Sequence, residues 1–121
     1  MAKKNKFESE PADLALLFKA LSDPIRLDIF RYLRTRCAPI MVEHGEEAWM
    51  RIGPSVGEIC CAVSGSPKIT AKISHHLKEM RLAGLIAIKR RGKNMICGVR
   101  QDAINLLSDF LNIVDLTQTD L

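Results

Sequence analysis

The sequence predicts one domain that is mostly α-helical and carries a small β-hairpin. Along most of the chain, apolar residues recur at the three- and four-residue spacing of amphipathic helices. Directly after Gly84 the period changes to the alternation typical of β-strands, on both sides of a glycine-containing turn. The 121 residues are 47% hydrophobic and 26% charged, as in ordinary globular domains. We expect one domain over residues 11–116, between a flexible N-terminus at 1–10 and a frayed tail at 117–121.

The first two helices follow from apolar spacing and capping residues. A helix is expected over residues 11–21, with one face formed by Leu14, Leu17, Phe18 and Leu21. A second helix should begin at Pro24, since proline suits a first helical position and Ser22 or Asp23 can cap it. This helix is expected to bury Leu27, Phe30 and Leu33, and to end near Cys37-Ala38-Pro39.

Residues 38–54 interrupt the helical pattern with two prolines, two glycines and several acidic residues. They are expected to form a loop or small hairpin that turns at HGEE, with Trp49 packed on the body. Four side chains here have the chemistry of metal ligands: Glu43, His44, Glu46 and Glu47. Their spacing matches no known ligand pattern, so an exposed acidic turn is the favoured interpretation.

The second half of the chain has the element order of a winged helix-turn-helix. Ser55 and Glu58 form a capping-box signature at the start of the short helix SVGEICCAV. The turn SGSPK precedes a basic helix from about Thr70 to Ala83, which Gly84 ends. LIAIKR and NMICGV then alternate as two strands joined by RRGKN. A short helix, a tight turn, a basic helix and a hairpin, or wing, predict this fold.

The last helix, DAINLLSDFLNIVDL, is expected to start near Asp102. Its apolar stripe consists of Leu106, Leu107, Phe110, Leu111, Ile113 and Val114. That stripe is wider than one small core requires. Some of these apolar side chains are therefore expected to stay exposed in a single subunit.

Positive charge is concentrated in one segment of the chain. Residues 68–93 contain eight lysines and arginines but one acidic residue, Glu79, although the net charge of the whole chain is only +4. The alternatives are a surface that binds a polyanion and a solvated charged face. Because the cations occupy both the basic helix and the hairpin tip, we favour double-stranded DNA as the partner and expect no enzymatic activity.

The adjacent histidines of the basic helix point in different directions. On a helical wheel centred on Ile73, His76 lies at the border of the buried stripe, where it is expected to hydrogen-bond a nearby group. His75 lies on the outward side, about 100° away, so the pair cannot easily chelate one ion. The predicted DNA contacts are Lys68, Thr70, Lys72, Ser74, His75, Lys78, Lys89, Arg90, Arg91 and Lys93.

The cellular location bears on the four cysteines. No apolar run approaches the ~20 residues of a membrane span, and the N-terminus lacks the apolar segment of a signal peptide. A cytoplasmic protein with no membrane partner is therefore expected. Cys37, Cys60, Cys61 and Cys97 are then expected to be free thiols, metal ligands or redox groups, and not structural disulfides.

Two segments resemble the ArsR/SmtB-type (arsenic-responsive repressor) family of winged-helix transcription factors, and the resemblance covers about residues 14–115. LFKALSDPIRLDIFRYL, at 17–33, resembles the family's opening signature, and ISHHLKEMRLAGLIAIKRRGK, at 73–93, resembles its recognition helix and wing. The resemblance implies a homodimer joined by its first and last helices. It places Lys72, Ser74 and His75 toward DNA, and Arg90, Arg91 and Lys93 in the wing. It also implies repression that a metal, metalloid or other signal relieves.

The sensing site of the family is altered in this sequence. The arsenic and cadmium sensors carry Cys-x-Cys on the short helix, where this chain reads EICCAV. Because Cys60 and Cys61 point about 100° apart, a site for As(III) or another thiophilic metal ion needs local unwinding or a third sulfur, from Cys37 or Cys97. Oxidation of a thiol, and no role for the thiols, remain alternatives. The zinc sensors' site requires histidines that the last helix lacks.

Three functions remain to be compared. The leading hypothesis is a sequence-specific DNA-binding repressor, released by a thiol-binding metal(loid) or an oxidant. A thiol-based redox or detoxification enzyme acting through Cys60-Cys61 is disfavoured, because no Cys-x-x-Cys motif or positioned base is evident. A winged-helix protein–protein adaptor is disfavoured by the basic wing.

Overall fold

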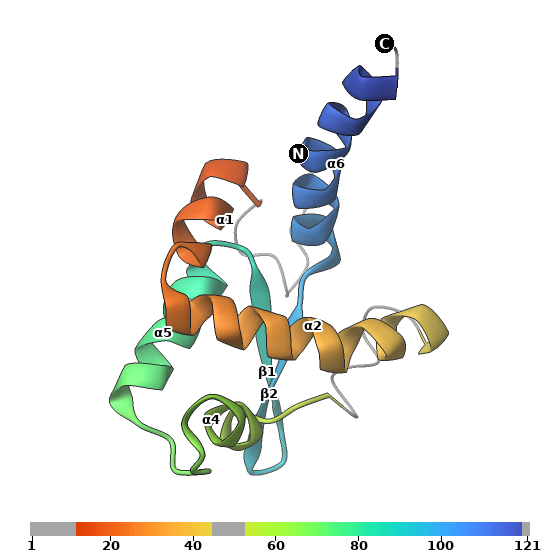
Figure 1. The fold of residues 1–121 in the computed structure, drawn as a ribbon. Coiled ribbons are helices and arrows are strands. Elements are labelled where there is room, and N and C mark those ends of the chain that lie inside the picture. The colour runs from red at the N-terminus through yellow and green to blue at the C-terminus, as the bar shows by residue number, and fades with distance from the viewer. Residues whose placement is uncertain (1–11, 45–52, 120–121) are drawn as a thin grey trace, which may run out of the picture.

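The structure, a computed structural model, describes residues 12–44 and 53–119 (Figure 1). Within these ranges, five helices accompany one two-stranded antiparallel hairpin, which confirms the predicted mostly α-helical class. The elements are α1 (Leu14–Leu21), α2 (Pro24–His44), α4 (Val56–Ser64), α5 (Ala71–Leu82), β1 (Ile86–Arg91), β2 (Asn94–Val99) and α6 (Gln101–Thr119). No helix in the described ranges has the length and apolarity needed to cross a membrane.

Aspartate side chains start the first two helices. The Asp13 carboxylate accepts hydrogen bonds from the backbone N–H of Ala15, at 2.9 Å, and of Leu16, at 3.3 Å, so α1 begins at Leu14 and not at residue 11. Asp23 caps α2 in the same way, accepting from the N–H of Ile25 at 2.8 Å. Of the two predicted caps for α2, the structure therefore selects Asp23.

Helix α2 is longer than predicted. It continues through Pro39 to His44, so the predicted end near Pro39 is wrong, and residues 38–44 are helix and not loop. Proline removes one helical hydrogen bond, that to the carbonyl of Thr35. The loss of one hydrogen bond falls at Thr35, an exposed residue, and the helix continues past it. Of the predicted acidic turn, Glu46, Glu47 and Trp49 lie outside the described residues.

The core lies where α1, α2, α4, α5 and the hairpin meet. Its fully buried side chains are Leu17, Ile29, Leu33, Ile59, Cys60, Met80, Leu85, Ile86, Ile96 and Cys97. Two predicted core positions are wrong. Leu27 is only half-buried, while Ile29 takes the central place on α2. Phe18 is 43% exposed, because it turns toward Phe110 of α6 in an edge-to-face contact with 5.6 Å between ring centroids.

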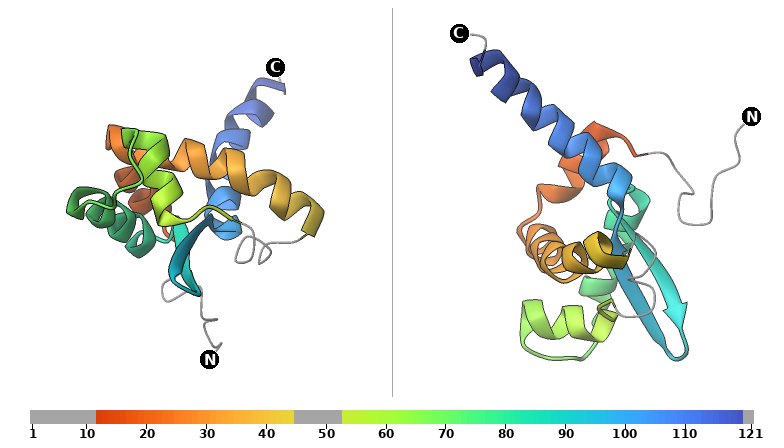
Figure 2. Two further views of the ribbon diagram at one scale, coloured as in Figure 1. Left: turned by 90° about the horizontal axis from the view of Figure 1, so that it is seen from below. Right: turned by 90° about the vertical axis from the view of Figure 1, so that its right-hand side faces the viewer.

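Helices α4 and α5 and the hairpin form the winged helix-turn-helix. Ser55 and Glu58 make the predicted capping box of α4, and Gly65, at φ +81°, ends that helix. In the hairpin, Ile86 pairs with Val99 and Arg91 with Asn94, so the turn is reduced to Gly92-Lys93. The start of α4 is attached to the wing, since the Cys97 N–H donates to the Pro54 carbonyl at 2.9 Å. The wing extends from the body at the end opposite α6 (Figures 1 and 2).

Helix α6 projects from the body (Figures 1 and 2). It starts at Gln101 and reaches Thr119, three residues beyond the predicted end at 116, so residues 117–119 of the expected tail are helical. Among its described side chains, Leu106, Phe110 and Leu111 are 37%, 46% and 60% exposed. Half of the six residues of the apolar stripe are therefore exposed in the described part of the subunit, and Leu107 is half-buried.

Candidate nucleic-acid interface

Helix α5 separates a buried face from a polar, cationic face. Ile73, His76, Leu77 and Met80 are buried against the core. The outward side chains, all exposed, are Lys72, Ser74, His75 and Lys78. This division follows from helical periodicity, and it matches the division that the sequence predicts. The structure therefore presents four of the ten predicted contact residues on the exposed side of one helix.

The turn before α5 contains two further predicted contacts, and one of them has a structural role. Thr70 is exposed, but its Oγ1 accepts a hydrogen bond from the Ile73 N–H at 3.2 Å and so caps α5. The hydroxyl proton of Thr70 is still available to a phosphate. Lys68 is exposed in the same turn. A threonine at this position thus sets the start of α5 as well as adding a polar group to its N-terminal end.

The wing carries cations at its tip. Arg90, Arg91 and Lys93 are exposed, whereas Lys89 is half-buried. The Arg90 Nε donates to the Gly92 carbonyl at 3.1 Å, which holds that side chain against the turn. Gly92, at φ +60°, permits the two-residue turn that brings these side chains to one end of the hairpin.

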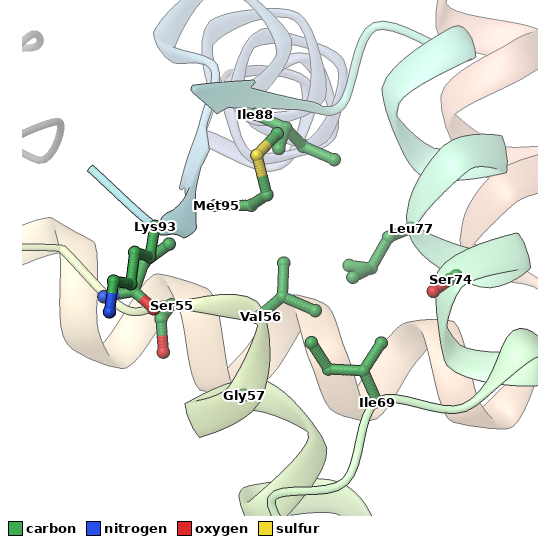
Figure 3. Close-up of a pocket in the computed structure, with 10 residues that line it drawn as sticks. Ser55, Val56, Gly57, Ile69, Ser74, Leu77, Ile88, Lys93 and Met95 are labelled. Carbon is green, nitrogen blue, oxygen red and sulfur yellow. The ribbon is translucent and has the colours of Figure 1, made fainter. Parts of the chain in front are cut away.

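The polar face of α5 and the wing tip border the same open space. Ser74 of α5 and Lys93 of the wing both line one cavity of about 350 Å³. In Figure 3, Ser74 and Lys93 lie on opposite sides of this cavity. The exposed side of α5, at Ser74, and the wing tip, at Lys93, therefore border one cavity.

His76 holds α5 against the start of α2. Its Nδ1 accepts a hydrogen bond from the Arg26 Nε at 3.1 Å, so this nitrogen carries no proton. Its partner lies 50 residues away in the sequence, and sequence reasoning, which expected a nearby partner, missed it. Burial lowers the pKa of His76 from its ordinary value of 6.5, and Arg26, His75 and Lys72 lower it further, while Asp23 opposes them.

Asp23 joins this arrangement from the cap of α2. Burial acts to raise its pKa, but the backbone hydrogen bonds from Arg26 and Ile25, with the positive charge of Arg26 and the nearby His76, outweigh burial and lower it. The carboxylate is therefore ionised at neutral pH and balances the guanidinium of Arg26. The start of α2 and the buried side of α5 thus share one polar contact within an apolar core.

The predicted thiol ligands are in different environments. Cys60 and Cys97 are fully buried, Cys61 is exposed, and the Cys37 side chain lies outside the described residues. Burial of Cys60 fits its spacing along α4, which places it on the core face. Among the described residues, no three His, Cys, Asp or Glu side chains gather closely enough to hold a metal ion. The two histidines of α5 are also separated, with 6.0 Å between ring centroids, one exposed and one buried.

Comparison with known proteins supports the fold. No protein-family model matches the sequence, and no curated protein sequence matches it significantly. Five chains of solved structures do match significantly. One is the crystal structure of M. tuberculosis Rv0081, which is 26% identical, with a TM-score of 0.54 over 88% of this chain and 90% of that chain. The likeness extends over most of both chains. This chain therefore has a transcription-regulator-like fold.

Proposed function

We propose that this protein is a sequence-specific double-stranded DNA-binding transcription regulator that acts as a repressor. The observation that carries the proposal is the exposure of cations both on α5, at Lys72 and Lys78, and at the wing tip, where Lys93 lines one cavity with Ser74 of α5. Like charges held together contribute nothing to folding, but they gain free energy beside phosphates through the release of counterions. The fold itself is one that regulators use to place a helix in the major groove.

The side chains on α5 and the wing would make different contacts with DNA according to their chemistry. Ser74 and His75 offer hydrogen-bonding groups of a length that reaches base edges when α5 lies in the major groove. Lys68, Lys72 and Lys78 would contact phosphates on either side of that groove. Arg90, Arg91 and Lys93 would contact the backbone or an adjacent narrow minor groove. Ser74 and His75 would then set sequence preference, and the cations would set affinity.

A homodimer is part of this proposal. Apolar side chains remain uncovered on α1 and α6: Leu16 at 47%, Phe18 at 43%, Leu106 at 37%, Phe110 at 46% and Leu111 at 60%. Phe18 and Phe110 touch, so the two helices form one continuous apolar face. A second copy of the same face would cover it, and the resulting two-fold symmetry would present two α5 helices to successive major grooves.

Fluorescence anisotropy with DNA from upstream of the gene, and with unrelated DNA of the same length, tests the function. The logarithm of the affinity should fall with the logarithm of salt concentration, by about 0.9 per phosphate contacted. Arg90→Gln and Arg91→Gln should weaken binding to both DNAs. Ser74→Ala and His75→Ala should reduce the preference for the upstream DNA, because they remove base contacts and leave the cations in place.

Arg34→Gln is the matched control, because Arg34 is exposed on α2 and outside the predicted contacts. It should bind DNA like the wild type. Equal affinity of the wing variants and this control would contradict the proposed DNA face. Binding that shows no preference for any natural DNA sequence would contradict sequence-specific regulation.

Release by a thiol-binding metal(loid) or an oxidant belongs to the same proposal. The exposed thiol of Cys61 supports it, since a reagent in solution reaches this sulfur first. Arsenite should then lower the DNA affinity of the wild type, and Cys61→Ser should remove the response. The same response in Cys60→Ser, Cys61→Ser and the wild type would exclude both thiols of α4 as sensors.

A further inference from the structure

The cavity between α4, α5 and the wing has walls that DNA binding does not explain. Its apolar lining is formed by Val56, Ile69, Leu77, Ile88 and Met95. Ser55, Gly57, Ser74, Lys93 and Asn94 complete it. In Figure 3 the side chains of Val56, Leu77, Ile88 and Met95 converge on one space, while Ser55 and Lys93 lie at its margin. The volume, about 350 Å³, is within the range of small-molecule sites.

Two of these apolar side chains are unusually open to solvent. Ile69 is 54% exposed and Met95 is 42% exposed, although both lie among cationic residues. Phosphates and sugars offer such side chains little, because a DNA backbone is polar and charged. An apolar molecule between them would instead remove their surface from water, at about 25 cal/mol per Å².

Lys93 determines the charge of the molecule that fits. It is the one charged residue of the cavity lining, and within residues 12–44 and 53–119 its ammonium group forms no ion pair. The Ser55 oxygen accepts the hydrogen bond that caps α4, from the Glu58 N–H, and its hydroxyl group carries no charge. An apolar cavity bordered by one unpaired ammonium group complements a molecule with an apolar body and one negative charge.

We propose that this cavity binds a small monocarboxylic acid with an apolar body, of the size of a medium-chain fatty acid. The carboxylate pairs with Lys93 Nζ, and the chain packs against Ile69, Ile88 and Met95. Bound acid competes with DNA, because it neutralises Lys93 and adds negative charge between α5 and the wing. This competition rests on the proposed function, whereas binding of the acid does not.

Isothermal titration calorimetry of the DNA-free protein with decanoate tests the site. Affinity should rise from hexanoate to octanoate to decanoate by about threefold to fourfold per methylene, as expected for burial of each group. Decyltrimethylammonium has the same chain with the opposite charge, and it should bind at least about tenfold more weakly. Equal affinity for the two decyl compounds, or no dependence on chain length, would overturn the proposal.

Two pairs of variants place the acid in this cavity. Met95→Glu puts a carboxylate in the wall, opposite Arg90 in the strand pairing, and should abolish decanoate binding, whereas Met95→Leu should keep it. Lys93→Met should weaken decanoate about tenfold. Lys68→Met removes a charge from the turn outside the cavity and should bind decanoate like the wild type. Circular dichroism establishes that each variant is folded. Retained binding in folded Met95→Glu would exclude this site.

A competition experiment separates this proposal from the proposed function. Decanoate should raise the apparent Kd for upstream DNA by a factor of one plus the ratio of the decanoate concentration to its own Kd, and it should leave the DNA affinity of Met95→Glu unchanged. Decanoate binding without any DNA binding would contradict the regulator and leave the acid site in place. DNA binding without decanoate binding would contradict the acid site and leave the regulator in place. Simultaneous binding of both ligands at undiminished affinity would overturn the competition.

Discussion

The hydrogen bond between Arg26 and His76 explains why a histidine lies on the buried side of α5. The imidazole is only 7% exposed, and its Nδ1 accepts from the guanidinium at 3.1 Å. Protonation of Nδ1 would replace this attraction with repulsion between two cations. Among the described residues, Asp23 is the acidic group that raises the pKa of the ring, against Arg26, His75 and Lys72. The neutral imidazole is therefore the form that the fold prefers.

Stability should consequently fall in mild acid. The pKa of His76 is lowered in the folded state, so as the pH falls the unfolded chain takes up the proton first. The contribution of His76 to the free energy of unfolding is therefore complete above the unfolded pKa of about 6.5 and declines as the pH falls below it. Urea denaturation at pH 7.5 and 5.5 should show a smaller loss of stability for His76→Asn than for the wild type. His75→Asn, at an exposed position, is the matched control. Equal pH dependence in His76→Asn and the wild type would refute this role.

The thiols should differ in reactivity according to their burial. Cys61 is exposed, whereas Cys60 and Cys97 are fully buried. In the native state, 5,5′-dithiobis(2-nitrobenzoate) should therefore react rapidly with one thiol fewer in Cys61→Ser than in the wild type. It should react rapidly with the same number of thiols in Cys60→Ser and Cys97→Ser as in the wild type. Denaturation should make the buried thiols reactive. Rapid reaction that persists unchanged in Cys61→Ser would show that the predicted accessible thiol is not the one attacked.

At the scale of elements, the junction between α5 and the wing depends on Gly84. This residue has φ +84°, and its N–H donates to the Arg81 carbonyl at 3.0 Å as the helix ends. A Cβ at this position would lie 3.3 Å from the Ala12 Cα and 3.4 Å from an Arg100 nitrogen. Arg100 is buried and held by Asp102, through Nε and Oδ1 at 3.0 Å, so it cannot easily move aside. Close packing as well as backbone conformation therefore requires glycine here.

Two glycine substitutions should distinguish packing from conformation. Gly92 also has positive φ, at +60°, but a Cβ there would meet open space. Gly92→Ala should cost about 1 kcal/mol of stability, from the backbone alone, and Gly84→Ala should cost more than that. Urea denaturation of both variants at neutral pH measures the difference. Equal costs would mean that Ala12 and Arg100 yield without penalty.

The element boundaries show where local signals are sufficient. The cap at Ser55, the approximate start of α5 at Thr70, its end at Gly84 and both strands were predicted from residues within a few positions, since capping and turn formation are local interactions. The end of α2 was not predicted correctly. Pro39 favours termination locally, yet the helix continues to His44.

At the scale of the molecule, the uncovered face of α1 and α6 has the composition of an interface. Phe18 and Phe110 contact each other there, and they remain 43% and 46% exposed. Helix α6 stands away from the body formed by the other described helices and strands (Figure 1). Exposed clusters of this kind usually mark sites of association.

Substitution of Leu111 should therefore convert a dimer into monomers. Leu111 is 60% exposed, so Leu111→Glu should leave the subunit folded while it places a charge in the proposed interface. Sedimentation equilibrium should give a dimer for the wild type and a monomer for the variant, with DNA affinity reduced at least about tenfold through loss of the second half-site. Met95→Glu changes an exposed apolar residue of the wing and should remain dimeric. A monomeric wild type would contradict the homodimer.

The sequence by itself determined the mostly α-helical class, the order of the elements and the polar side of α5. These depend on periodicity and capping, which are interactions between residues close in the chain. Only the tertiary structure decided the partner of His76, the exposure of Phe18, the burial of Cys97, and the cavity between α5 and the wing. Each of these depends on contacts between segments far apart in the sequence, whose relative positions arise only when the core packs.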